Sequence, residues 1–77
     1  MPKLHPVSGK DAIKALERLG FKIARPPRGS HVVLRKETPE GAIGTVVPLH
    51  KELAIGTLRG VLRLAKVSVE EFLQNLP

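Results

Sequence analysis

Hydrophobic residues recur every three or four positions in three segments of the chain, a spacing that places them on one face of a helix. The three sets are Ala12, Ile13, Leu16 and Leu19; Leu58, Val61, Leu62 and Ala65; and Val69, Phe72, Leu73 and Leu76. The first set predicts a helix over roughly residues 9–19. The second predicts an amphipathic helix after a loop through His50 and Gly56, and the third predicts a short terminal helix.

Polar residues and a glycine indicate where these helices begin and end. Ser8 with Asp11, and Ser68 with Glu71, have the spacing of capping boxes, in which a side-chain oxygen accepts a hydrogen bond from a backbone N–H of the first turn. Gly20 provides a stop after the first helix, because glycine readily adopts the backbone angles that end helices.

The region between the first two helices predicts a small sheet. Residues 21–24 alternate in the manner of a short strand that half faces a core. The prolines at 26–27 should end this strand, because proline cannot donate to a sheet hydrogen bond. Arg28 and Gly29 then turn the chain, and residues 31–36 form a second strand.

A hairpin should follow the second strand. Residues 38–41, Thr-Pro-Glu-Gly, place proline and glycine where a type I turn favours them. Residues 43–48 form the third strand, with Gly44 as a candidate bulge and Pro48 as its end. The order α-β-β-β-α plus a short C-terminal helix predicts an α+β fold, a single domain over residues 1–77. Its three-stranded antiparallel sheet should have helices on one face and an open second face. The same α-β-β-β-α order of elements occurs in double-stranded-RNA-binding domains.

The composition narrows the possible partners. The chain has 13 lysines and arginines against 7 acidic residues, a formal net charge of +6 over 77 residues. This charge favours a polyanion such as nucleic acid, or an acidic protein, although a basic surface can also serve only solubility. The absence of cysteine excludes disulfides, zinc-finger sites and thiol nucleophiles. No apolar run has the length of a signal peptide or membrane span, so we expect a cytoplasmic protein with no membrane contact.

Basic residues gather in two stretches that contain no acidic residue. The first stretch holds Lys22, Arg25, Arg28, Arg35 and Lys36. In the second, residues 53–69, helical spacing places Arg59, Arg63 and Lys66 on one side of the predicted helix, where they could follow successive phosphates. The alternative is an ordinary solvated face. Since the strands carry no interleaved aromatic residues on which bases could stack, an RRM-like platform is disfavoured.

Of the three histidines, His31 lies where a strand adjoins a basic cluster. Alternation puts His31, Val33 and Arg35 on one face, so His31 faces outward if Val32 and Leu34 pack under the helices. RNA cleavage without a metal requires proton transfer at the 2′-hydroxyl and the leaving oxygen, and stabilisation of the phosphorane charge. Imidazole can transfer the protons and basic side chains can hold the phosphate. The chain lacks the clustered carboxylates or spaced histidines of a metal mechanism, so we expect no metal or cofactor.

Three short motifs, in their order and spacing, carry a resemblance to a known family. They are Gly29-Ser30-His31, Val47-Pro48-Leu49-His50 and Gly56-Thr57-Leu58-Arg59. Together they resemble the HicA family of toxin–antitoxin mRNA interferases over nearly the whole chain. The chain departs from the usual pattern by Pro26-Pro27-Arg28 and by a longer turn over residues 37–42.

The resemblance implies a double-stranded-RNA-binding-like fold, endonucleolytic cleavage of mRNA, and neutralisation by a HicB-type antitoxin. It assigns the catalytic role to His31, with Gly29 and Ser30 setting the approach and orientation of that histidine. A plain hairpin turn is the alternative for Ser30. The alternative function is a non-catalytic RNA-binding or protein-interaction module that uses the same basic surfaces.

The second proton-transfer group is left open between His50, a lysine and solvent. His50 follows the third strand and could reach the same site, but a structural role in the following turn is the favoured interpretation. His5 lies in a proline-flanked leader and is expected to be inert.

Overall fold

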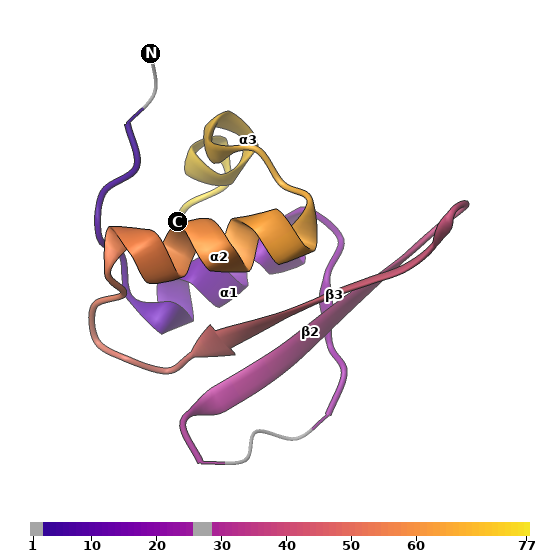
Figure 1. Cartoon of the computed structure of the whole chain (residues 1–77), viewed down its shortest axis with the longest axis horizontal. Coiled ribbons are helices and arrows are strands. Elements are labelled where there is room, and N and C mark those ends of the chain that lie inside the picture. The colour runs from indigo at the N-terminus through magenta and orange to yellow at the C-terminus, as the bar shows by residue number, and fades with distance from the viewer. Residues whose placement is uncertain (1–2, 26–28) are drawn as a thin grey trace.

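A computed structural model describes residues 3–25 and 29–77, and its element order confirms the predicted α+β fold. The elements are α1 (Gly9–Arg18), β1 (Lys22–Ile23), β2 (His31–Thr38), β3 (Gly41–Pro48), α2 (Ile55–Ala65) and α3 (Val69–Gln74). Figure 1 shows the helices stacked over one face of the sheet, with the β2–β3 hairpin extending beyond them. The arrangement matches that of double-stranded-RNA-binding domains.

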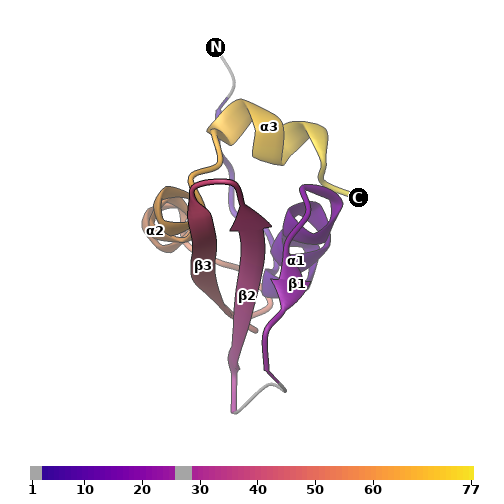
Figure 2. The same cartoon turned by 90° about the vertical axis from the view of Figure 1, so that its right-hand side faces the viewer.

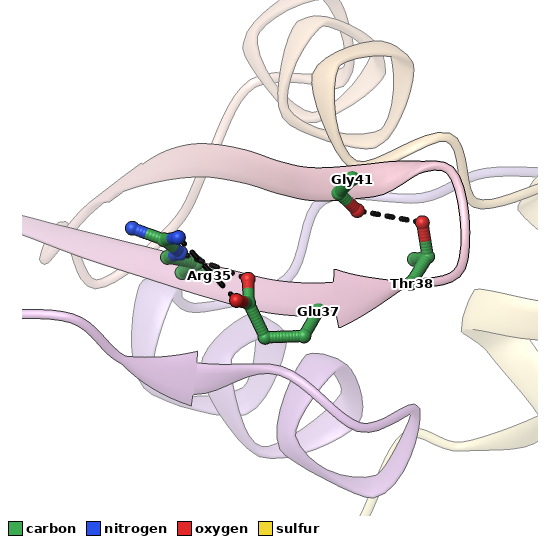
Figure 3. Close-up of polar contacts among 4 residues, drawn as sticks. All are labelled: Arg35, Glu37, Thr38 and Gly41. Carbon is green, nitrogen blue, oxygen red and sulfur yellow. Dashed lines mark hydrogen bonds and ion pairs between the residues drawn. The ribbon is translucent and has the colours of Figure 1, made fainter.

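The sheet is antiparallel, in the order β1-β2-β3. The β2–β3 register runs without interruption from His31 opposite Pro48 to Thr38 opposite Gly41, so the predicted bulge at Gly44 is wrong. The turn at 38–41 is confirmed, but the strands reach its ends, so the predicted long turn over 37–42 is wrong as well. The Thr38 hydroxyl donates a 2.6 Å hydrogen bond to the Gly41 carbonyl and supports this tight connection (Figure 3).

The helices bury one face of the sheet and leave the other face open. Figure 2 shows α2 on the β3 side of the hairpin and α1 on the β1 side, with α3 above them. The largest fully buried side chains are Phe72, Leu16, Leu34, Leu53, Leu58, Val32 and Val47. The one buried polar side chain among the described residues, Thr45, donates a 2.8 Å hydrogen bond to the Val61 carbonyl and joins β3 to α2. The core is therefore aliphatic apart from two phenylalanines.

The predicted helix caps are present to different degrees. Ser68 and Glu71 form the complete reciprocal capping box, whereas at Ser8 the side chain accepts from the Asp11 N–H. Gly20 has a φ of 102°, as its predicted role as a stop requires. No helix within the described residues is long and apolar enough to cross a membrane.

Two boundaries differ from the sequence-based expectation. The strand β1 has only two residues, Lys22 and Ile23, instead of the expected four. Phe21 before it is buried, whereas Ile23 at the sheet edge is 46% exposed. The expected stop at Pro26 and Pro27 lies outside the described residues. The helix α2 begins at Ile55, so Gly56 lies within it; its N-cap residue, Ala54, provides no side-chain cap that the sequence could reveal.

The start of α1 is joined to the end of β3 by direct backbone contact. The Gly9 N–H donates a 2.9 Å hydrogen bond to the His50 carbonyl, and a Cβ at Gly9 would overlap the carbonyl oxygen of Pro48. A second backbone hydrogen bond joins the same two segments: the Leu53 N–H donates to the Val7 carbonyl at 2.7 Å. Only glycine permits this approach, because any larger residue would push α1 away from β3.

Replacement of Gly9 by alanine should destabilise the fold. The added methyl group meets backbone that cannot move aside, and overpacking of this kind costs about 1–3 kcal/mol. Gly60→Ala is the matched control, because Gly60 lies within α2 with no atom near its missing Cβ. That change should stabilise the protein by about 0.5–1 kcal/mol through helix propensity. Urea denaturation followed by circular dichroism measures both, and a Gly9→Ala protein as stable as the parent would refute the contact.

Candidate functional site

His31 is the first residue of β2 and lies opposite Pro48, the last residue of β3. Val32 and Leu34 are buried beneath the helices at 2% and 0% exposure, so the predicted face assignment is confirmed. The His31 side chain is exposed and belongs, with Val33 and Arg35, to the open face of the sheet. An imidazole in this position can meet a large ligand without any rearrangement of the core.

The two residues before His31 have distinct backbone roles. Gly29 has a φ of 60°, a left-handed conformation that residues with a Cβ rarely adopt, and it is exposed. The Ser30 carbonyl accepts a hydrogen bond from the Leu49 N–H. This bond extends the β2–β3 pairing one residue beyond His31 and fixes the start of β2 against the end of β3. Arg28 lies outside the described residues.

His50 lies at the same end of the sheet as His31. It follows the end of β3 by two residues, and its carbonyl accepts the Gly9 N–H, so the segment has a structural role. The His50 side chain is exposed and lines a hollow of about 400 Å³. This hollow lies between the two chain segments that the Gly9–His50 hydrogen bond connects. The hollow is lined by Ser8, Lys10, Leu49, His50 and Lys51.

Lys10 and Lys51 were not among the residues that the sequence singled out. Lys51 could have been found from its position next to His50, but Lys10 is 40 residues away in the chain. It reaches this hollow only because Gly9 allows α1 to start against β3. These two ammonium groups add positive charge at the end of the sheet that carries His31.

The basic residues of strands β1 and β2 are divided between the two faces of the sheet. Lys22 is exposed and lies opposite Arg35, on the face that carries His31. Arg35 forms an ion pair with Glu37, with its Nε 3.1 Å from Oε2 (Figure 3). Lys36, in contrast, is half-buried on the helix side, where its Nζ lies 5.8 Å from the centre of the Phe21 ring. The structure therefore does not bring Lys36 to the open face.

The predicted basic side of α2 is confirmed for two of its three members. Arg59 and Arg63 are exposed, opposite the buried set Leu58, Val61, Leu62 and Ala65. Lys66 is exposed but follows the helix as its C-cap, with a left-handed φ of 56°. Since α2 covers the buried face of the sheet, these residues do not share the face of His31 (Figure 2).

A second row of basic residues lies on α1. Lys10, Lys14 and Arg18 are four residues apart and all exposed, so they follow one side of the helix. The Arg18 guanidinium donates a 3.0 Å hydrogen bond to the Asn75 carbonyl, and its position is therefore held by the C-terminal segment. The four-residue spacing was visible in the sequence but was not recognised there as a functional signal.

The exposed groups on the open face and at the end of the sheet provide two kinds of chemistry. The imidazole can accept or donate a proton in contact with solvent, and the cations at Lys22, Arg35 and Lys51 can bind a phosphate chain. Arg25, also exposed, follows β1 at the same open side of the sheet. Within residues 3–25 and 29–77, no three His, Asp or Glu side chains are grouped as metal ligands.

Comparison with known families identifies the chain. A search of curated proteins gave no match. The family model described as HicA toxin of bacterial toxin-antitoxin matches residues 9–67, from the start of α1 to just beyond α2. The match includes β2 with His31 and the whole of the sheet. The chain therefore belongs to the HicA toxin family of bacterial toxin–antitoxin systems.

Proposed function

We propose that this toxin is an endoribonuclease that cleaves mRNA without a metal ion and uses His31 as its catalytic residue. The observation that carries the proposal is the place of His31, which is exposed at the end of β2 on the open face of the sheet. An ordinary core histidine would be buried or hydrogen bonded, whereas this imidazole is free to meet a substrate. Membership of the HicA toxin family supports the same activity.

The proposed reaction is an internal phosphoryl transfer. A base removes the proton of a ribose 2′-hydroxyl, the 2′-oxygen attacks the adjacent phosphorus, and the bond from phosphorus to the 5′-oxygen breaks. The leaving 5′-oxygen takes up a proton, which yields a cyclic phosphate and a free hydroxyl. His31 serves one of the two proton transfers, and positively charged side chains of this surface stabilise the charge that develops on the phosphorane. Gly29 and Ser30 hold the backbone that presents the imidazole.

The second proton-transfer group is drawn from His50, a lysine or solvent. His50 is the strongest of these, because the Ser30–Leu49 and Gly9–His50 hydrogen bonds hold its segment at the same end of the sheet as His31. Lys10 and Lys51 beside it favour an anionic ligand in the hollow that the three residues share.

The proposed partners are mRNA and a HicB-type antitoxin. The phosphate backbone contacts exposed basic residues, namely Lys22, Arg25, Arg35, Arg59, Arg63 and Lys66. Arg28, outside the described residues, is proposed as a further contact, whereas Lys36 packs on the helix side and is left out. The antitoxin provides acidic groups to the hairpin and covers His31, so that it inhibits by occlusion. We place the activity in the cytoplasm, where mRNA is translated, and in a single domain of residues 1–77.

Replacement of His31 by alanine should abolish RNA cleavage and leave RNA binding nearly intact. General acid–base catalysis contributes roughly 10²–10⁴ to a rate, so the cleavage rate should fall at least about 100-fold. The measurement is the decay of labelled single-stranded RNA in the presence of EDTA. His5→Ala is the matched control, because His5 is exposed and lies before α1; it should cleave at the parent rate.

The outcomes separate the proposed function from its alternative. A His31→Ala protein that still cleaves at the parent rate would overturn the catalytic assignment. Loss of the parent activity in EDTA would indicate a metal mechanism instead. If the parent protein binds RNA but never cleaves it, the chain is a non-catalytic RNA-binding module.

Removal of the α2 arginines should weaken RNA binding in a salt-dependent manner. Each phosphate contact on single-stranded RNA contributes about 0.7 to the slope of log affinity against log salt, so Arg59→Ala with Arg63→Ala should lower the slope by about 1.4. Folding stability should change by less than about 1 kcal/mol, because both side chains are exposed. The test is a salt titration of labelled RNA on the His31→Ala protein, and an unchanged slope would exclude α2 from the RNA site.

Binding of a HicB-type antitoxin should protect His31 from chemical modification. One equivalent of antitoxin should stop RNA cleavage, because it covers the open face of the sheet. Diethylpyrocarbonate modification, followed by mass spectrometry, should then show His31 protected and His5 still reactive, since His5 lies outside the proposed interface. Full inhibition of cleavage with His31 still reactive would rule out occlusion of this residue.

A further inference from the structure

Gly44 has no evident role in the fold. It lies in the middle of β3 opposite Arg35, in a regular register without a bulge. Its φ is not in the positive region, and a Cβ built on it would meet the Leu34 carbonyl oxygen at an ordinary contact distance of 3.6 Å. Neither backbone conformation nor packing therefore requires glycine here. Because glycine weakens a strand, its presence in a regular strand indicates that something approaches the sheet closely.

The missing side chain leaves a hollow on the open face of the sheet. The hollow has a volume of about 410 Å³ and is lined by residues of β2 and β3 and by the two residues that follow β1. Its floor is formed by small or aliphatic residues, Ala24, Val33, Ala42 and Gly44, and Arg25 and Arg35 stand at its rim. This size falls within the range of small-molecule sites, at roughly 300–1,000 Å³. The hollow therefore has an apolar floor that is open to solvent, with the guanidinium groups of Arg25 and Arg35 beside it.

The hollow is next to the proposed catalytic residue. Val33 follows His31 by two residues on the same face of β2, a separation of roughly 7 Å along an extended strand. A nucleotide chain with a phosphate at His31 would therefore place a neighbouring base above Val33 and Gly44.

Unused backbone groups lie at the rim of the hollow. The Ala24 N–H donates to the Val33 carbonyl at 2.8 Å, so the odd-numbered residues of β2 turn their backbone groups toward β1. By the same alternation, Gly44 turns its N–H and carbonyl to the outer edge of β3, where the described residues form no further strand. Gly44 therefore has no backbone partner on that side among the described strands.

We infer that this hollow is a binding subsite for one unpaired nucleobase of the RNA substrate, adjacent to the phosphate that His31 acts on. The inference rests on the proposed function and adds to it the position of a base contact. The base lies flat on Val33 and the exposed backbone at Gly44, and the Arg35 guanidinium packs against it. A single hollow of this kind needs no row of aromatic residues.

A protein side chain fits the hollow less well than a base. The antitoxin expected for a basic toxin is acidic, and a carboxylate would have to lie on an apolar floor. Arg35 is already paired with Glu37, so its charge is met within the sheet. The face of its guanidinium is still available for stacking, which is how arginine contacts unstacked bases.

The test fills the hollow with Gly44→Val in the His31→Ala background. Valine suits a strand, so the variant should be at least as stable in urea as its parent. Affinity is measured for a mixed-sequence single-stranded RNA and for an abasic ribose-phosphate chain of the same length. We expect the preference for the base-containing chain to fall by about tenfold, the contribution of one stacked base, with abasic binding unchanged. Gly60→Val adds the same group to a half-buried glycine of α2 whose missing Cβ meets no atom, and it should keep the parent preference.

Three outcomes would overturn the subsite. The first is an unchanged preference in a folded Gly44→Val protein, and the second is an equal loss for both chains. The third is unchanged RNA binding with lost antitoxin binding, which would assign the hollow to the antitoxin. Failure of the proposed function would be recognised separately: the parent protein, with His31 intact, would then cleave no RNA. If the parent protein cleaves RNA but Gly44→Val leaves the base preference unchanged, only the subsite is rejected.

Discussion

The contact between Gly9 and the end of β3 determines how the rest of the molecule is arranged. A backbone without a side chain lets α1 start against the Pro48 carbonyl, and the Gly9–His50 hydrogen bond holds it there. The Ser30–Leu49 bond joins the start of β2 to the same point. Three segments far apart in the chain therefore meet at one end of the sheet. This junction brings Lys10 to the hollow beside His50, at the same end of the sheet as His31.

The thin core makes the two faces of the sheet very different. Val32, Leu34 and Val47 are needed beneath the helices, because two phenylalanines supply all the aromatic volume of the chain. Strand alternation then commits the intervening residues to the open face, whether or not they are polar. This face can carry His31, Arg35 and a residue without a side chain, Gly44, with little loss of buried apolar area from the core. The proposed chemistry uses residues that the core does not need.

Positive charge is distributed over both layers of the fold. Arg59 and Arg63 lie on α2 and the row from Lys10 to Arg18 lies on α1, whereas Lys22 and Arg35 lie on the open face of the sheet. A substrate held only by the helices would not reach His31. At the end of the sheet that carries His31, Lys10 of α1 and Lys51 line the same hollow as His50.

The sequence by itself determined the helices, the strand order and the outward position of His31. These depend on periodicity, caps and prolines, which act between residues close in the chain. Tertiary structure decided the rest: Lys36 packs on Phe21 of the neighbouring segment instead of joining the open face. It alone brought Lys10 to His50 and left Gly44 in a regular strand, at the floor of an open hollow. Such placements depend on contacts between distant segments, and local patterns carry no information about them.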